Sequence, residues 1–319
     1  MEIIEGTKLA RKVDYSFGDH AMLWDKGLGG EFKYANANNQ EFLDKAKEFE
    51  GKVMTLWIDN LRLYPRSVNV DSEGDLNFVE WLMFTNNLLG LCTLLPNNEF
   101  IIFTGQEDTP LDDKLKVPFN VRRIYGVNAL VEDPKITPMF FGVQRKMNAE
   151  DNRIEVLKAN VEADRHTEPT KLLYVNGSIQ RNPERDYWPN FEGKEWATCH
   201  FNKDSKYFPY NRYQEFLDQI KDHKFMACAL GHGTDCHRNL ESLYLRRVPV
   251  MKEHPYFRRL YKDFPILYIN DWSEVDDKLL IANDSLYQQA QTMDLSKLDL
   301  EILYKNWINY ANNQTEKSI

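Results

Sequence analysis

Apolar and polar positions follow a regular order between Phe225 and Trp272, where short apolar runs alternate with segments of mixed character. Phe225–Leu230, Val248–Met251 and Ile266–Ile269 are apolar runs of strand length. Such runs beside turn residues are typical of strands buried in a parallel sheet. The segments between them carry apolar residues at helical spacing. This stretch therefore predicts the order strand, turn, helix, strand, helix, strand.

The helix after the first of these strands is expected to be capped by Asp235, with Leu240, Leu243 and Tyr244 on its apolar face. The first half of the chain shows a similar alternation of apolar runs and amphipathic segments. Strands are expected there at Lys12–Phe17, Lys52–Ile58, Phe100–Thr104 and Arg123–Val127, and helices at Phe42–Phe49 and Asn77–Leu95, with a last amphipathic helix at Leu298–Ala311.

This alternation, with short connections, predicts an α/β fold with parallel sheets of Rossmann type. The chain has 319 residues, which is more than one typical domain and enough for two of moderate size. Met139–Val143 is expected to lead out of the first domain, and the charged stretch Arg145–Lys171 to hold the linker. We therefore predict a first domain over residues 1–147 and a second over residues 148–297.

Composition narrows the class of protein. Hydrophobic residues make up 42% of the chain, which is enough to fill two cores and excludes a disordered chain. The formal net charge of −9 disfavours an extensive nucleic-acid surface but leaves room for a local basic cleft. No apolar run reaches the roughly 20 residues of a membrane span, and the four cysteines show no paired spacing. We expect a cytoplasmic protein without membrane contact.

One edge of the second predicted sheet carries candidate chemistry. Ligands of open parallel sheets bind beyond the carboxyl ends of the strands, next to helix N-termini. At that edge Arg238 and Glu241 follow a glycine-rich turn and, three residues apart, share one helix face. The guanidinium can meet a diphosphate oxygen, and the carboxylate can accept hydrogen bonds from a ribose. An intrahelical ion pair on a solvated face is the alternative, and spacing alone leaves both open.

The run GHGTDCHRNLESLYLRRVPV, from Gly231 to Val250, resembles the donor-binding segment of exostosin-type and related GT-B glycosyltransferases. Leu172–Arg185 is similar to the strand and loop that open the same donor domain. The resemblance implies a GT-B fold, in which two Rossmann-like domains face each other across a cleft. It also implies that the C-terminal helix, over residues 298–319, packs back on the first domain.

A second resemblance concerns the acceptor. Lys52–Pro65 is similar to the segment that bears the catalytic aspartate in the DNA β-glucosyltransferases of T-even bacteriophages, which modify 5-hydroxymethylcytosine. The matching aspartate is Asp59, and Arg62 keeps its place. The phage enzymes' Gly-Ser and two arginines match residues 177, 178, 181 and 185, and their Arg-x-x-Glu matches residues 238 and 241. Leu243–Val250 is closer to exostosins, so the donor sugar need not be glucose.

The two resemblances imply an inverting transferase that moves a sugar from a UDP-sugar to 5-hydroxymethylcytosine in double-stranded phage DNA. Asp59 would be the catalytic base, with Asp19 and His20 as substitutes. The donor-binding residues would be Gly177, Ser178, Arg181, Arg185, Gly233, Thr234, Asp235, His237, Arg238 and Glu241. The acceptor-binding residues would be Arg62, Arg66, Arg122 and Arg123. We expect a monomer, located in the host cytoplasm if a phage encodes it.

No metal site is expected. The chain lacks the Asp-x-Asp pair with which metal-dependent transferases hold a cation, and His232, Cys236 and His237 have a spacing unsuited to zinc. The arginines and a helix dipole would neutralise the diphosphate instead. We therefore expect no required cofactor and leave open a divalent cation that stimulates turnover.

Two other functions remain open. A cytoplasmic exostosin-like transferase acting on a polysaccharide or glycan would need no phosphate contacts and suits the charge of −9. A catalytically inactive protein that binds sugar nucleotides is disfavoured, because Asp59 and the donor arginines are all present. Glucose, arabinose, xylose and N-acetylglucosamine all remain open as the sugar.

Overall fold

The computed structural model describes residues 1–4, 6–17, 39–58, 89, 92, 93, 95–105, 111, 115, 117–143, 152–163, 168–202, 213–231 and 233–313. The chain divides into two compact units, each with its own core. Unit 1 comprises Met1–Ile3, Gly142–Lys146 and Asp151–Asp299. Unit 2 comprises Ile4–Phe141, Met147–Glu150 and Leu300–Ile319.

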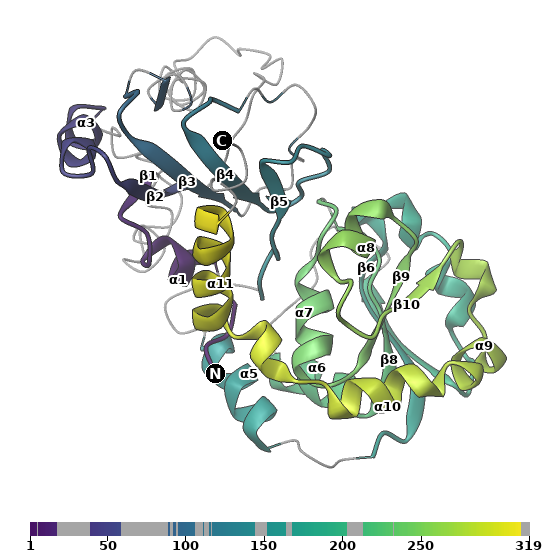
Figure 1. Cartoon of the computed structure of the whole chain (residues 1–319). Helices are drawn as coiled ribbons and strands as arrows, with labels where there is room; N and C mark the ends of the chain where they lie inside the picture. The colour runs from purple at the N-terminus through teal and green to yellow at the C-terminus, as the bar shows by residue number, and fades with distance from the viewer. Residues whose placement is uncertain are drawn as a thin grey trace, which may run out of the picture. The chain divides into compact units, whose positions relative to one another are not determined.

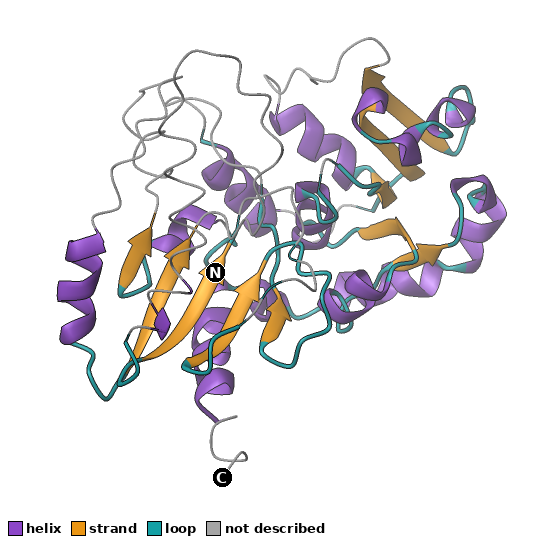
Figure 2. Cartoon of the chain, turned by 90° about the horizontal axis from the view of Figure 1, so that it is seen from above, coloured by secondary structure: helices purple, strands orange, loops and turns teal. Residues whose placement is uncertain are grey.

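Unit 2 contains a sheet of five parallel strands, whose order β1-β2-β3-β4-β5 is also their order along the chain. Figure 2 shows these strands as neighbouring orange arrows. β2 and β3 are buried at every residue after the first, which explains the continuous apolar runs in the sequence. The strands are β1 Tyr15–Phe17, β2 Val53–Ile58, β3 Glu99–Thr104, β4 Val121–Gly126 and β5 Ile136–Pro138.

Helices pack on both faces of this sheet; a short helix, α1 (Gly6–Ala10), precedes β1. On one face, Phe42 of α3 (Asn39–Lys47) lies in the core with Leu56 and Phe100. On the other face, Tyr125 of β4 donates a hydrogen bond to the carbonyl oxygen of Trp307 in α11 (Leu300–Asn313), at 2.6 Å. The terminal helix thus begins two residues later than predicted and belongs to unit 2.

Unit 1 contains a second sheet of five parallel strands, in the order β10-β9-β8-β6-β7. β6 is the first of these strands in the chain, and its two neighbours are β7 and β8, so the direction of progression reverses there. In open parallel sheets, the crevice beyond the carboxyl ends at such a switch point is where ligands bind. The strands are β6 Lys171–Ser178, β7 Ala197–Asn202, β8 His223–Ala227, β9 Val248–Lys252 and β10 Leu267–Ile269.

Side chains of this sheet alternate between two faces, both covered by helices (Figure 1). Val175 packs with Trp188, Trp272 and Tyr287 on one face, whereas Tyr174 lies against Phe216 of α6 on the other. The helices are α5 Arg153–Ala163, α6 Tyr213–Lys221, α7 His237–Tyr244, α8 Pro255–Leu260, α9 Asp277–Ala282 and α10 Asp284–Thr292. In the described part of the chain, no helix combines the length and the apolar character that crossing a membrane requires.

The predicted α/β architecture with parallel sheets is confirmed, and three details of it were wrong. The strand predicted at Phe225–Leu230 is β8, which begins at His223 and ends at Ala227. Of the residues after it, Cys228 and Ala229 are buried and Leu230 is half-buried. The predicted linker Arg145–Lys171 contains helix α5. The sequence also gave no sign of β7, because this edge strand has no fully buried residue and therefore no apolar run.

One other expectation concerns residues that are only partly described. Most of the helix predicted at Asn77–Leu95 lies outside the described residues, although Leu89, Cys92 and Thr93 are helical.

We predict that His223 makes unit 1 less stable in mild acid. This side chain is fully buried, with Nδ1 2.6 Å from the carbonyl oxygen of Gln219 and Nε2 2.8 Å from the Thr198 hydroxyl oxygen. Burial lowers its pKa to about 4, below the value of about 6.5 for an unfolded chain. Between these two values the unfolded state binds more protons than the folded state. The contribution of neutral His223 to the free energy of unfolding is therefore complete above pH 6.5 and is lost as the pH falls towards 4.

Urea unfolding followed through the buried tryptophans of unit 1 would measure this loss, which should amount to a few kcal/mol at most. The free energy of unfolding of His223→Gln should fall less steeply over the same interval, because its side chain does not titrate. Equal slopes for the wild type and the variant would contradict the prediction.

Candidate functional site

Two guanidinium groups approach Gly177, the penultimate residue of β6. A Cβ atom at this position would lie 3.1 Å from Nη1 of Arg185 and 3.2 Å from Nη2 of Arg238. The φ angle of Gly177 is +148°, which side-chain-bearing residues rarely adopt. Both arginines are buried, with 2% and 8% of their surface exposed. The glycine therefore allows two positive charges to lie close to the end of β6.

Arg185 joins the ends of the two strands at the switch point. Its Nη1 donates to the carbonyl oxygen of Ser178, the last residue of β6, at 2.9 Å, and its Nη2 donates to that of Ala229, after β8, at 3.4 Å. The guanidinium also lies over the ring of Trp188, 5.1 Å from the centroid. These contacts fix a positive charge at the place where the topology predicts a ligand.

Two side chains between Arg181 and Arg185 in the sequence connect the loop after β6 to the loop after β8. Asn182 Nδ2 donates to the carbonyl oxygen of Gly231 at 3.0 Å, and the backbone N–H of Leu230 donates to Glu184 Oε2 at 2.9 Å. Glu184 Oε1 accepts a further hydrogen bond from Trp272 Nε1 at 3.2 Å. Burial raises the pKa of Glu184 above its ordinary value. Sequence analysis missed both polar residues, because no motif marks them.

The N-terminus of α7 differs from the prediction. Cys236, not Asp235, occupies the N-cap position, and its side chain makes no capping hydrogen bond. The buried carboxylate of Asp235 instead accepts hydrogen bonds from the Cys236 N–H, the Asn239 amide and the Tyr261 hydroxyl, at 3.0, 2.7 and 2.7 Å. Three donors converge on one oxygen, so Asp235 holds the turn in shape.

Arg238 and Glu241 are both buried on α7. This disfavours the alternative of an ion pair on a solvated face, because such a pair requires exposed side chains. Arg238 reaches Gly177, and Glu241 Oε1 accepts a hydrogen bond from the Tyr213 hydroxyl at 2.9 Å. A cation and a carboxylate are thus held one turn apart behind the switch point, which suits a diphosphate and the sugar attached to it.

The other predicted donor residues surround this group or lie near it in the chain. His237 is the first residue of α7, and its Nδ1 lies 2.8 Å from the carbonyl oxygen of Gly142. Arg181 is half-buried after β6; Gly233 is buried and Thr234 half-buried in the turn before α7. The assignment of donor contacts to these residues stays a prediction.

Arg122 and Arg123, predicted to bind the acceptor, are engaged within unit 2. Arg122 contacts Glu99 and donates to Asn312 Oδ1 at 2.8 Å. Arg123 is buried, donates to Thr137 Oγ1 at 2.7 Å and lies over the ring of Tyr310. The remaining predicted catalytic and acceptor residues lie outside the described residues: Asp19, His20, Asp59, Arg62 and Arg66.

Metal binding was not expected from the sequence. Within the described ranges, no group of three or more His, Cys, Asp or Glu side chains is placed to hold a metal ion. The charge at the switch point is instead supplied by the guanidinium groups of Arg185 and Arg238.

No known protein family matches this sequence, and no curated protein is significantly similar to it. Among solved structures, the chain is similar to an α1,3-fucosyltransferase at 12% identity and a TM-score of 0.37, over 76% of this chain and 81% of that chain. An α1,3-fucosyltransferase with GDP-fucose matches at 12% identity and a TM-score of 0.36, over 70% of this chain and 80% of that chain. Likeness at this level carries no inference about function.

We predict that Gly177→Ala weakens binding of pyrophosphate at least about tenfold, the loss expected when a charge-assisted contact is removed. The new methyl group would displace the guanidinium groups of Arg185 and Arg238. Isothermal titration calorimetry of the purified variant would measure the loss.

Gly193→Ala is the matched control. Gly193 also has a positive φ, +75°, but no atom lies within 4 Å of an added Cβ. This variant should lose stability from backbone strain and bind pyrophosphate as the wild type does. Equal affinities for all three proteins would show that Gly177 does not border an anion site.

Proposed function

We propose that this protein is a glycosyltransferase of GT-B type that takes its sugar from a nucleoside diphosphate. The observation that carries the proposal is the approach of the Arg185 and Arg238 guanidinium groups to Gly177 at the switch point of unit 1. Two like charges in a buried place repel each other, and an anion between them removes that repulsion. A diphosphate supplies such an anion.

The same arrangement suits the chemistry of sugar transfer. As the bond between the sugar and the diphosphate breaks, negative charge grows on the leaving oxygen. Arginines that are already in place stabilise this charge more in the transition state than in the ground state. No metal ion is required for this step, because the guanidinium groups supply the positive charge. Glu241, one helical turn after Arg238, is proposed to accept hydrogen bonds from the ribose of UDP.

The proposed acceptor is the hydroxymethyl group of 5-hydroxymethylcytosine in DNA. The resemblance of Lys52–Pro65 to the catalytic segment of the phage enzymes supports it. In this proposal Asp59 takes the proton from the acceptor hydroxyl, which attacks the anomeric carbon from the face opposite the diphosphate. The cytosine would be flipped out of the duplex to reach the base.

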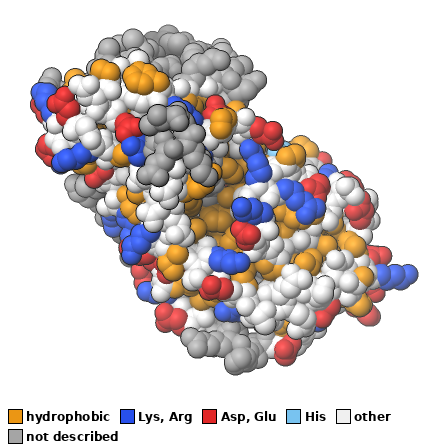
Figure 3. Space-filling view, viewed as in Figure 1, with side chains coloured by type: hydrophobic (Ala, Val, Ile, Leu, Met, Phe, Trp, Pro, Cys, Tyr) orange, Lys and Arg blue, Asp and Glu red, His pale blue; other side chains and the backbone are white. Residues whose placement is uncertain are grey.

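The surface of unit 1 sets a limit on how DNA could bind. Basic side chains lie beside acidic ones on the face of unit 1 that Figure 3 shows, and the whole chain carries a formal charge of −9. DNA contacts would therefore be local and sensitive to salt.

Mass spectrometry of nucleosides tests the reaction directly. DNA containing 5-hydroxymethylcytosine is incubated with the protein and a panel of UDP-sugars and GDP-sugars, and then digested to nucleosides. A mass increase on 5-hydroxymethylcytosine is expected with one donor, and its size distinguishes a pentose from a hexose. If donors bind but no nucleoside gains mass, the DNA acceptor is wrong and a glycan acceptor becomes the next to test.

We predict that Asp59→Asn abolishes transfer and leaves UDP affinity unchanged, because the amide cannot take a proton.

Glu241→Ala should have the opposite profile, with UDP affinity reduced about tenfold or more by the loss of hydrogen bonds to a charged acceptor. Parallel calorimetry and transfer assays separate the two effects. Near-normal turnover of Asp59→Asn would remove Asp59 as the base.

A further inference from the structure

A buried hydrogen bond connects the predicted ribose-binding carboxylate to a helix on which sequence analysis placed no function. The hydroxyl of Tyr213, the first residue of α6, donates to Glu241 Oε1 at 2.9 Å. Tyr213 is 8% exposed and Glu241 2% exposed. In such surroundings, a hydrogen bond to a carboxylate is strong enough to hold the carboxylate in one orientation.

The ring of Tyr213 is itself held from two sides. Phe216, one turn further along α6, stacks on it with the ring centroids 5.9 Å apart. The guanidinium of Arg153, the first residue of α5, lies 5.2 Å from the ring centroid. The ring, and with it the hydroxyl that contacts Glu241, is therefore fixed in place.

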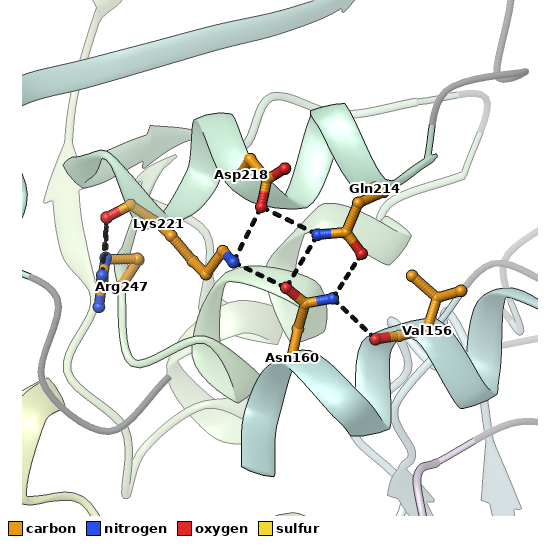
Figure 4. Close-up of polar contacts among 6 residues, drawn as sticks. All are labelled: Val156, Asn160, Gln214, Asp218, Lys221 and Arg247. Atoms are coloured by element: carbon orange, nitrogen blue, oxygen red, sulfur yellow. Dashed lines mark hydrogen bonds and ion pairs between the residues drawn. The ribbon is translucent and has the colours of Figure 1, made fainter. Parts of the chain in front are cut away.

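Helix α6 is in turn fixed to α5 by a network of polar side chains (Figure 4). Asn160 of α5 exchanges two hydrogen bonds with Gln214 and accepts a third from Lys221 Nζ at 2.7 Å. Asp218 accepts from Gln214 Nε2 and pairs with Lys221 Nζ, both at 2.9 Å. At the end of α6, Arg247 donates to the carbonyl oxygen of Lys221. The start of α6, and with it Tyr213, thus has little freedom to shift.

We propose that Tyr213 is a positioning residue that orients Glu241 to recognise the ribose of the donor, and that it sets the preference for ribose over 2′-deoxyribose. The inference rests on the proposed donor site. A carboxylate has about four lone-pair positions; when one of them is occupied by the Tyr213 hydroxyl, the carboxylate has a defined direction in which to meet the neighbouring 2′- and 3′-hydroxyls. A donor without the 2′-hydroxyl loses one of these hydrogen bonds.

The test compares three ligands by calorimetry: UDP, 2′-deoxy-UDP and pyrophosphate. The wild type is expected to bind UDP about tenfold more tightly than 2′-deoxy-UDP, the effect of one hydrogen bond to a charged group. Tyr213→Phe, which keeps the ring and loses only the hydroxyl, should reduce this ratio to about two. Its affinity for pyrophosphate should equal that of the wild type, because pyrophosphate contains no ribose.

Tyr244→Phe is the matched control. Tyr244 lies on the same helix as Glu241, is also buried and donates to the carbonyl oxygen of Leu298 at 2.7 Å. Removing its hydroxyl should lower the melting temperature and leave the preference for ribose intact. A merely structural role of Tyr213 would give the same result as this control, with lower stability and an unchanged ratio, and would overturn the inference.

Other outcomes separate the inference from the proposed function. A wild type that binds UDP and pyrophosphate but does not distinguish UDP from 2′-deoxy-UDP overturns the role of Tyr213 and leaves the donor site standing. A wild type that binds neither UDP nor pyrophosphate overturns both.

Discussion

Repulsion between two buried guanidinium groups is the constraint around which unit 1 is arranged. Arg185 and Arg238 both lie within about 3 Å of the place where a side chain of residue 177 would begin. Like charges held this close repel each other. The carbonyl oxygens of Ser178, at the end of β6, and of Ala229, after β8, accept hydrogen bonds from Arg185, and its guanidinium lies over the ring of Trp188. An anion bound between the arginines would turn the repulsion into attraction.

The 3₁₀ turns that directly follow β6 carry Arg185 and have to hold its charge in place. Asn182 and Glu184 hold these turns in place, because their side chains make hydrogen bonds with backbone groups of the loop after β8. Glu184 also places a carboxylate next to Arg185 in the chain and takes a hydrogen bond from Trp272 in the core. Movement of one loop would therefore break its hydrogen bonds with the other, so we expect the two loops to move together.

The sequence predicted the parts of this molecule that depend on local pattern. Continuous apolar runs revealed β2 and β3, and the resemblance to donor-binding segments pointed to Gly177, Arg185, Arg238 and Glu241, which the structure brings into one half of unit 1. It could not show β7, because none of the residues of this strand is fully buried, and it gave no prediction for α6. Nor could it show Tyr213 beside Glu241, since 28 residues separate them and only the sheet brings them together.

The position of Tyr213 depends on the contacts between helices α5 and α6. Asn160, Gln214, Asp218 and Lys221 join α5 to α6 by hydrogen bonds that are individually weak at a partly exposed surface. They form a connected network, however, because each side chain contacts two others in the group. Their sum fixes the first turn of α6, and this turn carries the hydroxyl that contacts Glu241. In the proposed donor site, selectivity for the sugar of the nucleotide thus depends on a helix pair that need not touch the nucleotide.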